Sequence, residues 1–248
     1  MVVGLNSFRE WFRGYERNYA IIGGTACDLL MTSAGVSFRA TKDIDMVLIV
    51  EVLNAEFGLR FWEYVKAAGY VYRSKSTGAP EFYRFIEPKS AEYPVMIELF
   101  SRHINGITLP PDAVLTPLPI DDDISSLSAI LLDDNYYEFL KSGVKVVDGI
   151  SVLSEAHLIP FKAKAWLDLT SRRAIGGQVD SRNIKKHKND AIKLSGLFSS
   201  EFRLDLPETI KDDIRKFLTA NIDDAEKLLN IAQAYGVSEV IPVGKINL

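Results

Sequence analysis

The chain has 248 residues, of which 47% are hydrophobic and 25% charged, and its formal net charge at pH 7 is −4. This composition is ordinary for a globular protein, and the length is enough for one large or two modest domains with a buried core. The slight acidity excludes non-specific nucleic-acid binding over the whole surface, though not a local basic patch. The single cysteine, Cys27, excludes an internal disulfide.

The first residues, 1–18, carry charges too early for a secretory signal. No apolar run in the sequence approaches the length of a membrane span, so we expect a cytoplasmic protein with no membrane partner. Aromatic residues at helical spacing predict a helix over 8–16, with Ser7 as its N-cap.

The segment 19–51 predicts a strand, a tight turn, a helix and a second strand. A short apolar run, 19–22, ends in Gly23-Gly24-Thr25, and an amphipathic stretch follows. Two glycines let the backbone turn sharply without a side chain to block a phosphate. The next helix offers free N–H groups and the positive end of its dipole, and Thr25 adds a hydroxyl. We interpret this turn as a phosphate-binding site.

Asp43 and Asp45 open the second apolar run of this segment, 46–50. Residues two apart on a strand project from the same face, so the two carboxylates lie side by side while Ile44 points into the core. Adjacent carboxylates repel each other unless a cation lies between them. Oxygen ligands in a hydrated site suit Mg²⁺, and the phosphates of a nucleotide would complete its coordination shell.

Beyond this segment, apolar periodicity predicts a helix over 53–69 that ends at Gly69. Short apolar or alternating runs then predict strands over 70–73, 82–86 and 95–100.

Glu98 is the only carboxylate in the otherwise apolar run 94–100. Burial of an unpaired carboxylate costs several kcal/mol or forces the group to take a proton. A metal ion shared with Asp43 and Asp45 would remove this cost. The alternative is a glutamate that pairs with a lysine or arginine, for example Arg102; we favour the metal site.

The prolines and aspartates of segment 109–123 predict an irregular acidic loop in solvent. Residues 127–132 then predict a strand, and 145–153 predict a hairpin. The chain changes character near Ser154, which we expect to cap the next helix.

From residue 155 the sequence is helical almost to its end. In the helix 157–173, Lys162 lies on a partly apolar stripe, whereas Lys164 can pair with Asp168 one turn on, as on an ordinary surface helix. Lys162 is therefore the better catalytic candidate.

A helix over 180–197 carries a basic run, Lys185 to Lys188. This run is either a solvated helix face or a contact for RNA or nucleotide phosphates, and both interpretations stay open. His187 in this run is interpreted as a surface residue. Two further helices, 206–220 and 223–235, are predicted to pack as a pair.

The motifs of the first half resemble the nucleotidyltransferase superfamily that includes DNA polymerase beta. The closer resemblance is to the AbiEii/AbiGii-type abortive-infection nucleotidyltransferase toxins, which carry a GGTAL-like turn before an R-x-T-x-D-I-D block. The matching residues here are Gly23, Gly24, Thr25, Arg39, Thr41, Asp43, Ile44 and Asp45.

The resemblance continues in the second half. The family's lysine-centred helix, K-x-x-A-L, is matched by Lys162 and Ala165, with Trp166 in place of the leucine. Of its D-x-x-D pair only Asp190 is matched, because His187 stands at the first position.

The resemblance implies an α+β fold: a polymerase beta-like mixed sheet with flanking helices, expected over 1–153, and a mostly helical domain over 154–248. It also implies magnesium-dependent transfer of a nucleoside monophosphate from an NTP to an acceptor, with Mn²⁺ as a substitute ion. The acceptor expected is RNA or a protein, in a toxin–antitoxin or abortive-infection system with an antitoxin partner.

The expected site follows from these motifs and from the carboxylate argument. Asp43, Asp45 and Glu98 are the expected metal ligands and, with Lys162, the catalytic residues. The expected substrate-binding residues are Gly23, Gly24, Thr25, Arg39 and Asp190. Two alternatives remain: a nucleotidyltransferase for a small molecule of the antibiotic type, and a non-catalytic nucleotide-binding module.

Overall fold

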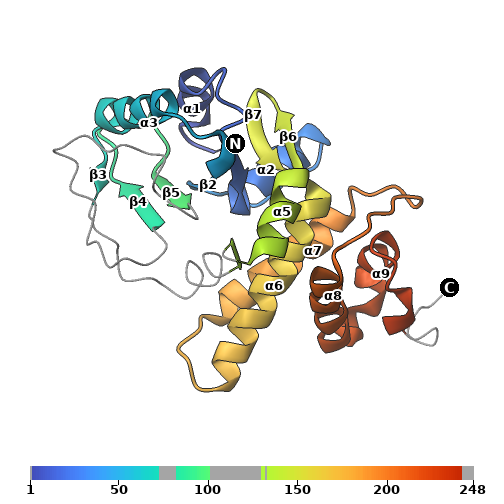
Figure 1. Ribbon diagram of the computed structural model, residues 1–248. Coiled ribbons are helices and arrows are strands. Elements are labelled where there is room, and N and C mark those ends of the chain that lie inside the picture. The colour runs from blue at the N-terminus through green and yellow to red at the C-terminus, as the bar shows by residue number, and fades with distance from the viewer. Residues whose placement is uncertain (1, 73–81, 101–129, 132, 242–248) are drawn as a thin grey trace. The chain divides into compact units, whose positions relative to one another are not determined.

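The computed structural model describes residues 2–72, 82–100, 130–131 and 133–241 (Figure 1). The contacts divide the chain into two compact units, residues 1–120 with 144–154 and residues 121–143 with 155–248. The sequence predicts a single boundary between residues 153 and 154, whereas the contacts place Ser154 in the first unit and the segment 121–143 in the second.

The first unit contains a seven-stranded mixed sheet in the order β3-β4-β5-β2-β1-β7-β6. Two neighbouring pairs, β2 with β5 and β1 with β7, are parallel, and the other pairs are antiparallel. The strands are β1 (Tyr19–Ile22), β2 (Asp43–Leu48), β3 (Val71–Tyr72), β4 (Phe82–Ile86), β5 (Met96–Phe100), β6 (Val144–Val147) and β7 (Ile150–Leu153). The predicted hairpin over 145–153 is confirmed as β6 and β7.

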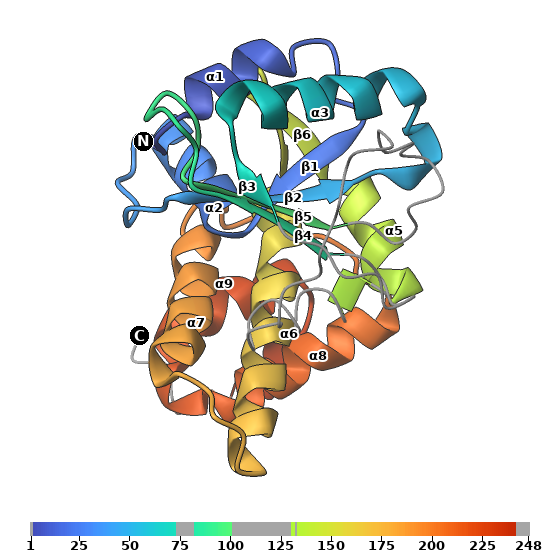
Figure 2. The ribbon, with the colours of Figure 1, turned by 90° about the vertical axis from the view of Figure 1, so that its left-hand side faces the viewer.

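The helices of the first unit are α1 (Leu5–Trp11), α2 (Gly23–Ser33), the 3₁₀ turn η1 (Val50–Val52) and α3 (Ala55–Ala68). Figure 2 shows α1 and α3 side by side above the sheet. Aromatic rings link the two helices to each other and to β1: the ring centroids are 5.2 Å apart for Phe12, the residue after α1, and Tyr64 of α3, and 5.5 Å apart for Phe8 of α1 and Tyr19 of β1. Apolar burial of this kind is the main stabilising contribution to the unit.

The end of α3 at Gly69 confirms the prediction from sequence, whereas its start lies at Ala55 and not at the predicted Leu53. Asn54 caps its first turn by accepting a hydrogen bond from the N–H of Phe57 at 2.8 Å, and Gly69 ends it with φ of 64°.

The prediction for α1 was wrong at both ends, because the helix begins at Leu5 and ends at Trp11. Gly4 stands at the N-cap with φ of 77°, and a Cβ there would lie 2.0 Å from the backbone nitrogen of Pro94. The close approach of another backbone thus fixes where the helix starts. Ser7 lies inside the helix and donates to the carbonyl of Gly4 at 2.9 Å.

The second unit is helical in the part that the structure describes. Its helices are α5 (Asp134–Ser142), α6 (Glu155–Ala174), α7 (Ser181–Ser195), α8 (Glu208–Ala220) and α9 (Ala225–Ala234), with 3₁₀ turns η2 (Ile222–Asp224) and η3 (Ser238–Val240). The four helices predicted from residue 155 onward are confirmed. Figure 1 shows α6 and α7 running alongside each other as a long hairpin.

The strand predicted over 127–132 was wrong where the structure describes it, since Ile130 and Leu131 are helical. Periodicity alone does not distinguish a short apolar run in a buried strand from one in a buried helix. The expected loop over 109–123, Arg102 and residues 73–80 lie outside the described residues. Among the described helices, none is both long enough and apolar enough to span a membrane.

Candidate functional site

Asp45 and Glu98 are brought together by the parallel pairing of β2 with β5. The register sets Asp45 opposite Glu98 and Asp43 opposite Met96. Residues paired across neighbouring strands project from the same face, so the two carboxylates are direct neighbours. Their side chains lie within hydrogen-bonding reach of each other. Glu98 is buried, whereas Asp43 and Asp45 are half-buried.

Arg84, which the sequence analysis missed, lies on the other side of Glu98. It pairs with Glu98 in the antiparallel register of β4 with β5. Its Nε donates to Oε1 of Glu98 at 2.9 Å, and its Nη2 forms an ion pair with the same oxygen at 2.7 Å. The alternative considered for Glu98, a pair with a basic residue, is therefore present, with Arg84 as the partner. The available signal was the single charged residue within the run 82–86.

Burial raises the pKa of Glu98 to about 9, helped by repulsion from Asp45 and by the hydrogen bond between these two side chains, while Arg84 lowers it in part. Near neutral pH, and with no cation bound, Glu98 therefore retains a proton. Two carboxylates set this close favour a shared proton or a shared cation.

Among the residues that the structure describes, no group of three or more His, Cys, Asp or Glu side chains is gathered closely enough to hold a metal ion. The expected three ligands are present instead as an adjoining pair, Asp45 and Glu98, with Asp43 two residues away on the same strand. The chemistry of the pair fits an oxygen-liganded ion such as Mg²⁺, because such an ion would relieve the repulsion. Further ligands would have to come from nucleotide and water oxygens.

The Gly23-Gly24 turn packs directly against this carboxylate pair. Gly23 has φ of 68°, and a Cβ there would lie 1.6 Å from Oδ2 of Asp45. A Cβ on Gly24 would lie 2.9 Å from Oγ1 of Thr41 and 3.2 Å from a guanidinium nitrogen of Arg39. The structure thus brings the turn and the R-x-T-x-D-I-D block together. A side chain at either glycine would collide with residues of this block.

Thr25 is buried, and its hydroxyl donates to the carbonyl oxygen of Asp43 at 2.5 Å. This bond ties the start of α2 to the start of β2. We expected the hydroxyl to serve a phosphate, but here it holds the turn and the Asp43–Asp45 strand in place.

Arg39 lies half-buried beside the turn, with its guanidinium 5.1 Å from the centre of the Phe38 ring. Its position next to Gly24 gives the turn a fixed positive charge in addition to the N–H groups of α2. An anionic group bound at the turn would meet both.

Lys162 and Asp190, the two residues singled out in the second half, are brought together within the second unit. Lys162 Nζ donates to Oδ2 of Asp190 at 3.2 Å, between α6 and α7. The two residues are only 4% and 2% exposed. The neighbouring Lys164 pairs with Asp168 at 3.7 Å, as predicted, and with Asp213 at 3.3 Å.

The basic run of α7 is partly used in ion pairs. Lys188 binds Asp224 at 2.8 Å, whereas Lys185 is exposed and Lys186 and His187 are half-buried. Only part of the run therefore presents its charge to solvent.

A scan against protein-family models and a search of curated proteins found no match for this chain.

Proposed function

We propose that the first unit binds a nucleoside triphosphate with a divalent cation and that the protein transfers a nucleoside monophosphate from it to an acceptor. The observation that carries this proposal is the meeting of Asp45 and Glu98 opposite the Gly23-Gly24 turn. Carboxylates that bind a cation and a turn that binds phosphates are the two parts that this chemistry needs in one place.

In the proposed reaction, an acceptor hydroxyl attacks the α-phosphorus, and the bond from that phosphorus to the bridging oxygen breaks to release pyrophosphate. Bound Mg²⁺ supplies positive charge that stabilises the transferring phosphoryl group. Asp45 and Glu98 would hold the ion, and Asp43 or Glu98 would take the proton of the acceptor hydroxyl. Mn²⁺ has the same preference for oxygen ligands.

The phosphates of the triphosphate need donors. We assign this role to the N–H groups at the start of α2 and to Arg39, which lies next to Gly24. Lys162 and Arg39 are the two candidates from the sequence for neutralising charge on the leaving pyrophosphate. The ammonium of Lys162 is buried and held by Asp190, so we now give the larger share of that role to Arg39.

For the acceptor, we propose RNA or a protein, as in toxin-like transferases that have an antitoxin partner. The motif resemblance supports this class.

A second candidate function is nucleotide binding without transfer. The observation that favours it is the engagement of Glu98 by Arg84, together with the lack of a gathered set of three ligands among the described residues. In this case the first unit would hold the triphosphate but would not activate an acceptor.

The test is incubation of the protein with each α-labelled triphosphate, Mg²⁺, and either total RNA, cell lysate or a panel of small hydroxylated molecules. Transfer of label to one fraction identifies the acceptor class. Asp45→Asn should abolish transfer and keep the fold, and Asp212→Asn, on an exposed face of α8, is the matched control. Undiminished transfer by Asp45→Asn would contradict the proposal, and bound but untransferred nucleotide would favour the second candidate.

A further inference from the structure

Arg84 belongs to none of the sequence motifs, yet it makes a close contact with Glu98. Its two contacts with Glu98, from Nε and Nη2, both end on Oε1, and both side chains are largely buried, at 20% and 9% exposed. A guanidinium donates two bonds from fixed directions, so it restricts the rotation of the carboxylate that accepts them. Oε2 of Glu98 is the oxygen that Arg84 leaves unengaged.

The order of the strands decides what Arg84 does at this site. The sheet runs β4-β5-β2, with Arg84 and Asp45 both in register with Glu98. Arg84 and Asp45 therefore flank Glu98 from opposite sides, and Arg84 does not lie between the two carboxylates. An arginine that competed with a cation would have to occupy the space between them.

We infer that Arg84 is a positioning residue, which holds Glu98 through Oε1 so that Oε2 is presented, together with Asp45, to a divalent cation. The inference rests on the proposed function, because it assumes that this pair binds the ion. Hydrogen-bonded partners of metal ligands commonly contribute about 10–100-fold to metal affinity. Arg84 is in that position, one strand further from Asp45.

Two possible roles of Arg84, as a nearby charge or as a positioning residue, predict opposite changes in cation affinity when it is replaced. Removal of a positive charge near a cation site should strengthen cation binding if charge alone matters. Loss of the guanidinium should weaken it if orientation of Glu98 matters more. Arg84→Met removes both charge and donors, and Arg84→Lys keeps the charge but loses the paired donors.

The experiment is titration of metal-free, full-length protein with Mn²⁺, with free Mn²⁺ measured by electron paramagnetic resonance. We expect Arg84→Met to weaken Mn²⁺ binding about 10–100-fold and Arg84→Lys to weaken it less, at constant secondary structure by circular dichroism. Arg13→Met removes an equal charge from an exposed pair with Glu10 and should leave the affinity unchanged. Wild-type or tighter binding by Arg84→Met would overturn the inference.

A double-mutant cycle separates positioning from general disturbance of the sheet. If Arg84 acts through Glu98, Arg84→Met should have no further effect on Mn²⁺ affinity in a Glu98→Gln background. An equal effect in both backgrounds would overturn the inference. If Arg84→Met fails to fold, Arg84→Lys replaces it in the cycle. Wild-type Mn²⁺ affinity of Arg84→Lys would then overturn the inference.

The same titration tells the two proposals apart. Weaker but measurable Mn²⁺ binding in Asp45→Asn and Glu98→Gln, with no effect from Arg84 substitutions, would refute only the role of Arg84. Unchanged binding in Asp45→Asn and Glu98→Gln would refute the proposed cation site and the inference with it.

Discussion

The two units bury charge in opposite ways. In the first, two carboxyl groups, Asp45 and Glu98, are neighbours, and Glu98 keeps a proton near neutral pH because Arg84 offsets only part of the cost of ionising it. In the second, Lys162 and Asp190 carry opposite charges and face each other across two helices. Two neighbouring carboxyl groups, one with a strongly shifted pKa, are typical of functional sites, whereas a buried opposite-charge pair is compatible with a purely structural role. The comparison favours the first unit as the place of the chemistry.

The largest effect on stability is expected when the opposite-charge pair of Lys162 and Asp190 is broken. Lys162→Met should leave Asp190 buried without the ammonium and lower the free energy of unfolding by about 3–5 kcal/mol, measured by urea denaturation. The double variant Lys162→Met, Asp190→Leu should recover most of that loss, because well-packed apolar groups replace such pairs at little cost.

This double variant also tests the chemical role expected for Lys162. Nucleotide transfer at the wild-type rate by the stable double variant would show that the pair is structural. Loss of transfer in a protein of normal stability would return Lys162 to the catalytic set.

The next effect concerns the turn. Gly23→Ala should destabilise the protein by about 1–3 kcal/mol, because its Cβ would collide with the Asp45 carboxylate at a positive φ. Gly24→Ala is the matched control, since its closest contact is the Thr41 side chain at 2.9 Å. The midpoints of thermal unfolding of the two variants provide the test. A lower midpoint for Gly24→Ala than for Gly23→Ala would contradict the described turn.

A third prediction follows from the raised pKa of Glu98. Its stabilising contribution is complete below the unfolded-state pKa of 4.5 and is lost as the pH rises toward about 9, because the folded state keeps a proton that the unfolded state releases. In EDTA, the free energy of unfolding should therefore fall relative to that of Glu98→Gln by at most about 1.4 kcal/mol per pH unit over this range. Parallel pH profiles for the two proteins would contradict the assignment.

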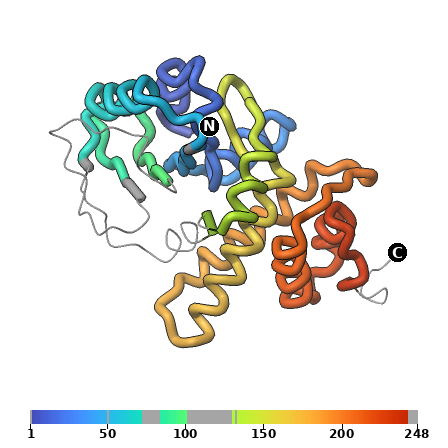
Figure 3. The backbone as a smooth tube through the Cα atoms, in the orientation of Figure 1, coloured from blue at the N-terminus to red at the C-terminus, as the bar shows by residue number. Residues whose placement is uncertain are grey.

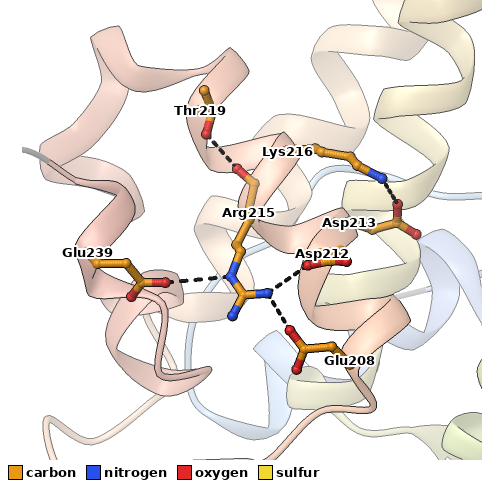
Figure 4. Close-up of polar contacts among 7 residues, drawn as sticks. All are labelled: Glu208, Asp212, Asp213, Arg215, Lys216, Thr219 and Glu239. Atoms are coloured by element: carbon orange, nitrogen blue, oxygen red, sulfur yellow. Dashed lines mark hydrogen bonds and ion pairs between the residues drawn. The ribbon is translucent and has the colours of Figure 1, made fainter.

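The smallest effect is expected at an exposed cluster in the second unit. Arg215 contacts Glu208 and Asp212, each at 2.6 Å, and lies 3.5 Å from Glu239 (Figure 4). Water and salt screen such contacts, so Arg215→Gln should leave the midpoint of thermal unfolding unchanged within error at high salt. A shift as large as that of Lys162→Met would mean that ion-pair number, and not burial, decides stability here.

Much of the fold could be predicted from sequence where the pattern is local. The glycine turn after β1, the two aspartates that begin β2 and the end of α3 at Gly69 depend on residues close together in the chain. Glu98 was also found locally, because a carboxylate within an apolar strand requires a partner.

What could not be predicted depends on contacts between distant segments. Arg84 became significant only through the register of β4 with β5, which its own run does not specify. The glycine that precedes α1, Gly4, is required by the close approach of the backbone at Pro94. The burial of Lys162 against Asp190 depends on how α6 meets α7, which the apolar stripe of one helix does not determine.

The path of the chain has a consequence for how the sheet is completed during synthesis. Figure 3 traces the backbone from α5 into the β6–β7 hairpin and on into α6. Strand β1 pairs with β7, which spans residues 150–153. One edge of β1 therefore stays unpaired until the ribosome has synthesised β7. An unpaired strand edge is a template for aggregation, so a recombinant fragment that stops before residue 144 should precipitate, and one that runs through Ser154 should not.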